Sequence, residues 1–307
     1  MPELDLLVVG GAGVDTIVRV DGLPPPDADT LLVPPIRDFA GHTGNGVALA
    51  AHALGLGVRL VDFVGDDLPG DFLRRRYARD GLDVDLAHSP AGTRRSVNLV
   101  DPTGRRLSFY DGRFVAGQRL PDAHWRPHLA QARHVHLSIV DWARHLFADA
   151  DAAGVPTSTD LHDWDGANPY HLDFALKAGL VFLSAARLGA GVGGVMARIL
   201  REGRAEAVVA TDGARGCHIL DRGADGLRHV PAAVPQGPVV DSNGAGDAFA
   251  AAFLAGRFAG LPLADCARLG TVAGAHACTV EGTHEGFLDR ATLLRRAGIT
   301  GPGTMGR

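Results

Sequence analysis

VVDSNGAGDAFAAAFLAG, residues 239–256, joins a β-like apolar run to an alanine-rich helix through a glycine turn. Gly244 and Gly246 permit positive φ and let the backbone approach a ligand closely. The N–H groups of Ala245, Gly246 and Asp247 fall at the helix N-terminus, where the backbone has no helical acceptors. The turn therefore predicts a cradle for a negatively charged group. An acidic residue that only offsets the helix dipole is the alternative interpretation of Asp247.

Outward from this stretch, short apolar runs alternate with helical patterns, which is typical of βα units and a mainly parallel sheet. Strands are predicted at Leu4–Gly10, Arg59–Val64, His134–Leu137, Thr157–Asp160, Leu180–Leu183 and Ala207–Thr211, with Cys217–Asp221 near the sheet edge. Helices are predicted at Gly46–Leu54, Asp71–Asp80, Asp141–Ala153, Asp247–Phe258 and Leu263–Thr279. The sequence therefore predicts an α/β fold in which residues 1–307 form a single domain.

Pairs of short strands without intervening helices break this alternation. They are predicted at Thr16–Val20 with Thr30–Arg37, and at Arg94–Asp101 with Arg105–Tyr110. The turn DPTGR, residues 101–105, joins the second pair as a hairpin. We predict that these strands, inserted at about residues 16–37 and 94–113, form a small antiparallel sheet that projects from the domain as a lid. An irregular edge of the main sheet is the alternative.

Composition and charge exclude several classes of partner. The 307 residues are 46% hydrophobic, which is enough apolar material for a large core. The formal net charge is −5 and basic side chains are interspersed with acids, so we expect no nucleic-acid partner. Apolar runs are far shorter than the roughly 20 residues of a membrane span, so we expect no membrane partner. The acidic start MPELDLL and three widely separated cysteines favour a cytoplasmic protein without a structural disulfide.

The sequence also lacks several nucleotide-binding motifs. Lys177 is the single lysine and lies in FALKAGL, outside any glycine-rich loop, whereas P-loop proteins and protein kinases need a lysine at a fixed motif position. GGAGVD at residues 10–15 lacks the third glycine of a dinucleotide-binding turn. His134 and His136 lie two apart on a predicted strand without a third ligand, so we interpret them as structural and expect no protein-built metal site.

DSNGAGD at residues 241–247, followed by AFAAAFL, resembles the C-terminal signature of the ribokinase-like (PfkB) carbohydrate kinase family. The resemblance extends over almost the whole chain. It implies a three-layer α/β/α domain with a mainly parallel central sheet and a small β-sheet lid. It also implies that Asp247 is the catalytic base and that Gly244, Ala245 and Gly246 form an anion hole for the phosphate being transferred.

The resemblance also points to substrate-binding residues. VVGGAGVDTIVRVDGLP, residues 8–24, resembles the family's first strand and turn, where the aspartate matching Asp15 binds substrate hydroxyls. AGHTGNGVALAAHALG, residues 40–55, keeps only part of the N-terminal signature, because the family's sugar-binding asparagine falls on Gly46. We take Gly41 and Asn45 as substrate contacts. We interpret His42 as a surface histidine without a role, with a hydrogen-bond donor near the sugar as the alternative.

On the nucleotide side, TDGARG at residues 211–216 resembles the loop along the ATP phosphates, which implies contacts from Thr211, Gly213 and Gly216. We take Asn243 as a further nucleotide contact. VFLSAARL, residues 181–188, carries Ser184 and Arg187 where the family has the Asn-x-x-Glu motif that acts on magnesium. Either Arg187 contacts phosphate while ATP and water hold Mg²⁺, or the enzyme is impaired or uses another carboxylate, for which the candidates are Asp160 and Asp163.

The resemblance implies an ATP-dependent kinase that transfers the γ-phosphate to a primary hydroxyl of a small sugar of the ribose, fructose or sugar-acid type. Mg²⁺ is the expected cofactor, K⁺ is a further candidate, and a homodimer through the lid is the expected assembly. The basic and polar lid residues Arg94, Arg95, Asn98, Arg105 and Arg113 favour a sugar. A nucleoside kinase, with Phe39, Phe109 and Tyr110 stacking on a base, is one alternative. A catalytically silent member that binds a ligand or assembles with a partner is the other.

Overall fold

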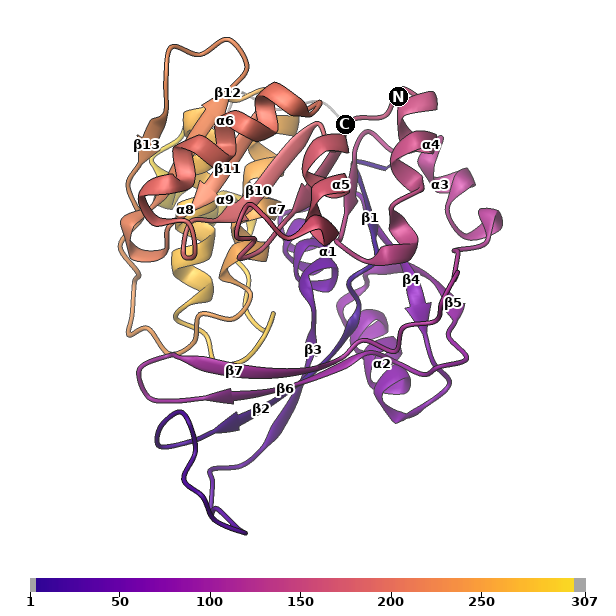
Figure 1. The fold of residues 1–307 in the computed structure, drawn as a ribbon, viewed down its shortest axis with the longest axis vertical. Helices are drawn as coiled ribbons and strands as arrows, with labels where there is room; N and C mark the ends of the chain where they lie inside the picture. The colour runs from indigo at the N-terminus through magenta and orange to yellow at the C-terminus, as the bar shows by residue number, and fades with distance from the viewer. Residues whose placement is uncertain (1–3, 301–307) are drawn as a thin grey trace.

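The computed structural model describes residues 4–300, in which nine strands form one twisted sheet in the order β13-β12-β11-β10-β9-β8-β1-β4-β5 (Figure 1). Neighbouring strands are parallel from β11 to β5, whereas the pairs β11–β12 and β12–β13 at one edge are antiparallel. The strand bounds are β1 Leu6–Val9, β4 Val58–Val64, β5 Asp83–His88, β8 Val135–Leu137, β9 Thr157–Asp160, β10 Leu180–Ser184, β11 Ala207–Thr211, β12 Cys217–Asp221 and β13 Arg228–Val230. The predicted α/β class with a mainly parallel sheet is confirmed.

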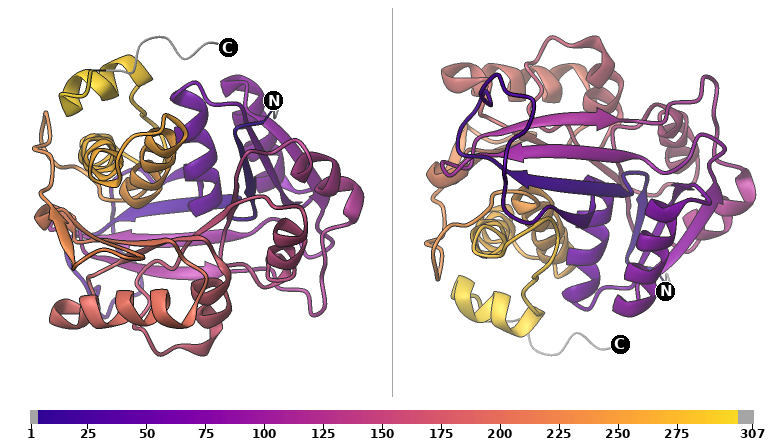
Figure 2. Two further views of the ribbon diagram at one scale, coloured as in Figure 1. Left: turned by 90° about the horizontal axis from the view of Figure 1, so that it is seen from above. Right: turned by 90° about the horizontal axis from the view of Figure 1, so that it is seen from below.

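Helices cover both faces of this sheet, as Figure 2 shows from above and below. One layer contains α3 (Arg126–Leu129), α4 (Leu146–Ala152), α5 (Pro169–Lys177) and α6 (Val192–Glu202). The other contains α1 (Thr43–Ala53), α2 (Leu68–Asp80), α7 (Ala245–Phe258) and α8 (Leu263–Ala277), with α9 (Arg290–Ala297) packed outside α7 and α8. None of the helices within residues 4–300 is long and apolar enough to span a membrane.

The central strands are apolar at successive positions because both of their faces are covered. In β1, Leu7 and Val9 pack into the core on the α4–α6 side, whereas Leu6 and Val8 pack into the core on the α1–α7 side. All four side chains are buried. Parallel strands that are buried on both faces bring their carboxyl ends to one edge of the sheet, and the loops at that edge build the site described below.

The lid is a separate four-stranded sheet in the described chain, with the order β3-β2-β6-β7, and Figure 1 shows it projecting from the main body. Its strands are β2 (Gly13–Arg19), β3 (Arg37–Gly41), β6 (Arg95–Val100) and β7 (Arg106–Asp111). The sheet is mixed rather than antiparallel, because β2 and β6 run parallel. The strand predicted at Thr30–Arg37 is wrong; Pro34 and Pro35 have no backbone N–H to donate, and pairing with β2 begins only at Arg37.

Several element predictions needed correction in detail. The helix predicted at Asp141–Ala153 is divided into a 3₁₀ turn, Asp141–Ala143, and α4. The elements missed from the sequence are α3, α5, α6, α9, β5 and β13. Helix α6 begins VGGV, and glycines of low helix propensity masked an otherwise amphipathic segment.

Candidate active site

A cavity of about 390 Å³ lies at the carboxyl ends of the parallel strands, between the main sheet and the lid. The loops after β1, β8 and β9 contribute Gly11, Ser138 and His162 to its wall. The lid contributes residues of β2, β6 and β7, and the segment from Asn243 to Asp247 closes the far side. Four predicted site residues line this cavity: Asp15, Asn243, Gly244 and Asp247.

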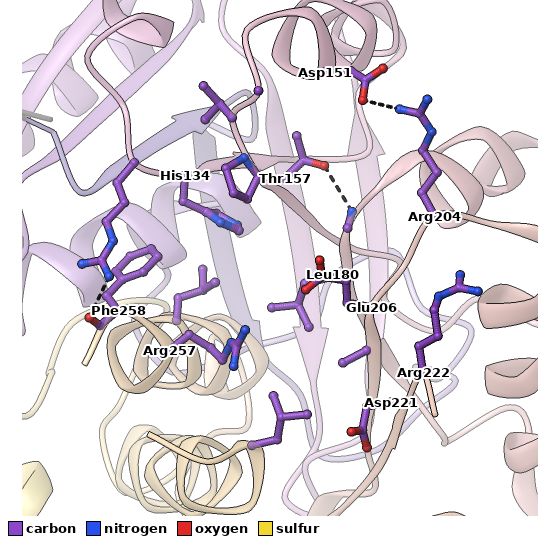
Figure 3. A pocket seen from close by; sticks show the side chains of 18 residues that line it. His134, Asp151, Thr157, Leu180, Arg204, Glu206, Asp221, Arg222, Arg257 and Phe258 are labelled. Atoms are coloured by element: carbon purple, nitrogen blue, oxygen red, sulfur yellow. Dashed lines mark hydrogen bonds and ion pairs between the residues drawn. The ribbon is translucent and has the colours of Figure 1, made fainter. Parts of the chain in front are cut away.

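A larger cavity of about 850 Å³ lies at the opposite edge of the main sheet (Figure 3). It is lined by residues at the amino ends of β9, β10 and β11, and no predicted site residue is among them. Two of its arginines are engaged with protein: Arg204 pairs with Asp151 at 2.6 Å, and Arg222 donates to the carbonyl oxygens of Leu200 and Gly203.

The glycine turn before α7 has the geometry of an anion cradle. Gly244 has φ 76° and directs the chain into the helix, and the carboxylate of Asp247 is buried in the first turn. The N–H of Ala245 makes a long hydrogen bond to the carbonyl of Ser242 at 3.4 Å, so it is not fully free as predicted. Within residues 4–300, the N–H groups of Gly246 and Asp247 make no hydrogen bond. A negative group placed at this turn can accept hydrogen bonds from these N–H groups.

The lid contacts this turn through two arginines. Arg19 of β2 forms an ion pair with buried Asp241 at 2.8 Å, and Arg106 of β7 donates to Asn243 Oδ1 at 2.7 Å. Asp241 Oδ1 in turn accepts the N–H of Asn243 at 3.0 Å. The conformation of the turn and the position of the lid are therefore linked.

Asp15 lies on β2 with its carboxylate at the cavity wall. Burial raises the pKa of Asp15, whereas the nearby charges of His284 and Arg106 and hydrogen bonds from His42 and Ser96 lower it. Gly41, opposite on β3, leaves room for this carboxylate, because a Cβ at Gly41 would overlap Asp15 Cγ. Asp15 can accept hydrogen bonds from substrate hydroxyls on its cavity side.

His42 is not a surface histidine, and that interpretation was wrong. It is mostly buried, adopts φ 67° before α1, and places Nε2 3.2 Å from Ser96 Oγ and 3.6 Å from Asp15 Oδ1. Burial lowers the pKa of His42 to about 3, with help from the charges of Arg94 and His284. A neutral imidazole therefore stands beside Asp15, on the wall of the cavity.

His284, in the loop after α8, is a residue that the sequence reasoning missed. Its Nε2 lies 2.7 Å from Asp247 Oδ2 and its side chain is 1% exposed. Asn45 does not line the cavity; it is fully buried, and its amide lies 3.3 Å from Nδ1 of His284. No motif flags a histidine in THEGF, residues 283–287, so only the fold reveals this contact.

The inner face of the lid is polar. Ser96 and Asn98 of β6 and Arg106, Ser108 and Tyr110 of β7 point into the cavity at every second position. The intervening residues Val97, Leu107 and Phe109 lie on the outer face, so Phe109 is not placed to stack on a base.

The basic residues expected to make the lid polar are placed otherwise. Arg94 pairs with buried Asp62, and Arg113 pairs with Asp111 at 2.7 Å. Arg95 lies near Asp38, on the outer side of the lid, at 3.7 Å. Arg106, Ser108 and Tyr110 occupy every second position of β7. This pattern identifies the inner face of the lid once the pairing of β7 with β6 is known.

Apart from Asn243, the residues predicted to bind nucleotide lie at or just after the carboxyl ends of β10 and β11. Ser184 and Thr211 are direct neighbours across these strands. Gly213 and Gly216 follow in the next turn, and Gly216 has φ 99°. Arg187 is exposed, with its guanidinium 3.8 Å from Asp163. Arg187 is thus available to a ligand at this edge but is not held in place by a buried partner.

No group of three or more histidine, cysteine, aspartate or glutamate side chains in residues 4–300 is placed to hold a metal ion. Asp160, at the end of β9, is buried, which raises its pKa, and the charge of Asp247 raises it further. Its Oδ1 accepts the N–H of His162 at 2.8 Å. The described carboxylates therefore do not form a metal cage.

The comparisons with known proteins agree with this geometry. The family model for pfkB family carbohydrate kinases matches residues 4–290. Acarbose 7(IV)-phosphotransferase of Actinoplanes sp. is 50% identical over 294 residues, covering 95% of this chain and 98% of the relative. Fructoselysine 6-kinase of Escherichia coli (strain K12) is 33% identical over 251 residues, covering 78% of this chain and 89% of the relative.

Solved structures of kinases also resemble this chain. A microbiome-derived acarbose kinase, Mak1, superposes with a TM-score of 0.89 at 46% identity, covering 96% of this chain and 99% of that one. Arabidopsis thaliana ribokinase complexed with ribose and ATP shares the fold, with a TM-score of 0.82 at 20% identity and coverage of 97% and 99%. The expected family and the ribokinase-like fold are confirmed. This chain belongs to the pfkB family of carbohydrate kinases.

Proposed function

We propose that this chain, an ATP-dependent carbohydrate kinase, phosphorylates a hydroxyl group of acarbose or of a closely similar carbohydrate. The reaction is supported above all by one observation: the carboxylate of Asp247 and the unpaired N–H groups of its turn adjoin the cavity that Asp15 also lines. The choice of substrate is supported by the 50% and 46% identities to two proteins named for acarbose.

Asp247 acts as the general base in this proposal. Its carboxylate takes the proton of the acceptor hydroxyl while that oxygen bonds to the γ-phosphorus, and the bond to the β–γ bridging oxygen breaks so that ADP leaves with the electron pair. The N–H groups of Ala245, Gly246 and Asp247 donate to the phosphoryl oxygens on which negative charge is spread. Most of the rate comes from holding the reactants in line.

The substrate is held at the other end of the cavity. Asp15 accepts hydrogen bonds from ring hydroxyls, and Asn98 and Ser108 add polar contacts from the inner face of the lid. Tyr110, with its ring 5.4 Å from His42, offers an apolar face to the C–H groups of a sugar ring. This wall is more polar than a nucleobase pocket requires, so we place nucleosides second.

Magnesium, in this proposal, enters with ATP and is held by phosphate oxygens and water, because the described residues do not build a cage for it. Thr211, Gly213, Gly216 and Ser184 bind the nucleotide, and Arg187 adds positive charge. We place the reaction in the reducing cytoplasm, which suits the free cysteines Cys217, Cys266 and Cys278.

A panel that measures ADP release by a coupled assay tests the proposed substrate. The acceptors are acarbose, fructoselysine, ribose, fructose, a sugar acid and adenosine, each with and without Mg²⁺ and with K⁺ or Na⁺. We expect kcat/KM for acarbose to exceed that for each other acceptor by at least about tenfold. Activity should disappear with EDTA, as MgATP is the expected form of the nucleotide. A higher kcat/KM on ribose, fructose or adenosine would overturn the proposed specificity, and ADP release from none would favour a silent protein.

The outer face of the lid supports the proposed homodimer. Val97, Leu107 and Phe109 are 36%, 43% and 58% exposed there, on adjacent strands of one sheet. An apolar sheet face of this kind is costly to leave in water. A second copy of the lid, packed face to face, would cover it.

Phe109→Glu is therefore expected to convert a dimer into a monomer in sedimentation-velocity runs at micromolar concentration, because a carboxylate would be buried at the centre of the contact. Leu227→Glu is the matched control, since Leu227 is also an exposed apolar side chain but lies before β13, away from the lid. A wild-type monomer, or a Phe109→Glu dimer, would disprove assembly through the lid.

A further inference from the structure

The structure places a histidine against the proposed catalytic base. His284 Nε2 lies 2.7 Å from Asp247 Oδ2, and both side chains are nearly inaccessible to solvent. We infer that His284 is a positioning residue that holds a proton against Oδ2 of Asp247, so that the other carboxylate oxygen is presented to the acceptor hydroxyl. This inference rests on the proposed role of Asp247 as base, and it adds a second residue, His284, that acts through Asp247.

The backbone is arranged to admit this ring. A Cβ at Gly46 of α1 would overlap Nε2 of His284 and lie 2.6 Å from Asp247 Oδ2. A Cβ at Gly244 would lie 2.7 Å from His284 Cδ2. The contact between His284 and Asp247 therefore requires glycine at both positions, because any other residue would displace the imidazole from the carboxylate.

The hydrogen bonds around the ring determine where its protons are. Nδ1 lies 3.2 Å from the carbonyl oxygen of Ala40, which can only accept, so Nδ1 carries a proton. Nε2 faces a carboxylate oxygen at 2.7 Å, and two lone pairs do not meet at that distance, so a proton lies there too. With Asp247 ionised, His284 is therefore an imidazolium.

Asn45 fits the same assignment. Its Oδ1 is buried without a hydrogen-bond partner in the described chain, while its Nδ2 lies 3.3 Å from Nδ1 of His284. Turning the amide end for end brings Oδ1 to Nδ1, which gives the orphaned acceptor a donor and removes a donor–donor contact. Asn45 then helps to keep the proton on Nδ1.

The imidazolium has two consequences for phosphoryl transfer. It occupies Oδ2, which fixes the rotation of the carboxylate and leaves Oδ1 for the acceptor hydroxyl. It also cancels the charge of Asp247 in a site that the anionic γ-phosphate must enter and that Asp15 and Asp160 already adjoin. A neutral hydrogen-bond donor of similar size would serve the first purpose but not the second.

The loop that carries His284 is anchored independently of the ring. The backbone carbonyl of His284 accepts from Arg76 Nη2 at 2.6 Å, and Arg76 also pairs with Glu285 and Asp80, each at 2.5 Å. A change confined to the His284 side chain leaves these contacts in place. His284→Gln should therefore fold, and its kinetics can be compared directly with those of the wild type.

The proton assignment can be tested without measuring activity. Long-range ¹H–¹⁵N spectra of wild-type protein labelled with ¹⁵N-histidine report the protonation of each ring nitrogen, and the His284 signals are those lost in His284→Gln. We expect both nitrogens of His284 to be protonated at pH 7.5. An unprotonated Nε2 or Nδ1 would overturn the inference.

Kinetics test the role of this proton. We expect His284→Gln to lower kcat by about 10- to 100-fold, as is usual when the positioning partner of a reactive group is lost, with KM for both substrates changed less than about threefold. His276→Gln, on α8 and outside the cavity, is the matched control and should behave like wild type. Wild-type kcat in His284→Gln would overturn the inference. Active Asp247→Asn would instead refute the base, so the two failures are distinguishable.

Discussion

Asp247→Asn is expected to lower kcat by about 10²- to 10⁴-fold, the range that a positioned general base contributes. The substitution keeps the size of the side chain and its place in the first turn of α7, but it removes the atom that takes the hydroxyl proton. The backbone N–H groups of the turn do not depend on this side chain. KM and the calorimetric Kd for ATP and for the carbohydrate should therefore change less than about threefold.

Single-turnover measurements give the cleanest comparison, because they isolate the chemical step from product release. Asp225→Asn, an exposed aspartate in the loop between β12 and β13, is the matched control for the same chemical change and should leave turnover unaffected. Turnover of Asp247→Asn within tenfold of wild type would refute the role of base. An equal loss of substrate affinity would show that the carboxylate serves binding instead.

The glycine turn before α7 was readable from sequence because its function is local. Gly244, Gly246 and Asp247 lie within four residues. The positive φ of Gly244, the start of α7 and the acidic residue in its first turn all follow from that order. The strands β1, β4 and β8–β11 were readable for the same reason, since each is a short apolar run, although the helices α5 and α6 between β9, β10 and β11 were missed. Asp15, which the family resemblance implied as a substrate contact, lies within β2 and lines the cavity.

Contacts across long sequence distances were not readable. His284 meets Asp247 across 37 positions and Asn45 across 239, and nothing in either segment specifies the other. Arg106 was missed because the face of β7 could not be assigned until its register with β6, across the five-residue turn 101–105, was known. Charge was also misleading: Arg94 is basic in sequence but is neutralised by Asp62 inside the protein.

The buried pair of Asp62 and Arg94 is the source of the second large effect. Asp62, on β4, is 0% exposed; its Oδ2 accepts the N–H of Ala12 at 2.7 Å, and its Oδ1 accepts from Arg94. Arg94 Nε also donates to the carbonyl of Ala12 at 3.2 Å. Ala12 directly precedes β2 and Arg94 directly precedes β6, so this group joins the main sheet to the root of the lid.

Asp62→Ala is therefore expected to lower stability by about 3–5 kcal/mol, because it leaves the buried guanidinium of Arg94 without its counter-charge and the buried N–H of Ala12 without an acceptor. In a chain of this size the loss corresponds to a fall in Tm of about 6–15 °C in a calorimetric scan. KM for the carbohydrate should rise as well, since β2 carries Asp15. Turnover at saturating substrate should change less, because the turn before α7 does not contact Asp62.

Two further variants separate the buried pair from general effects of charge removal. Asp83→Ala breaks the exposed pair with Arg59 on the neighbouring strand and should cost at most about 1 kcal/mol. Asp62→Ala combined with Arg94→Met should recover part of the lost Tm, because the uncompensated charge is gone and an apolar side chain fills its place. Equal falls in Tm for Asp62→Ala and Asp83→Ala would contradict a stabilising role of the buried pair. No recovery in the double variant would mean that the N–H of Ala12, rather than the guanidinium, needs Asp62.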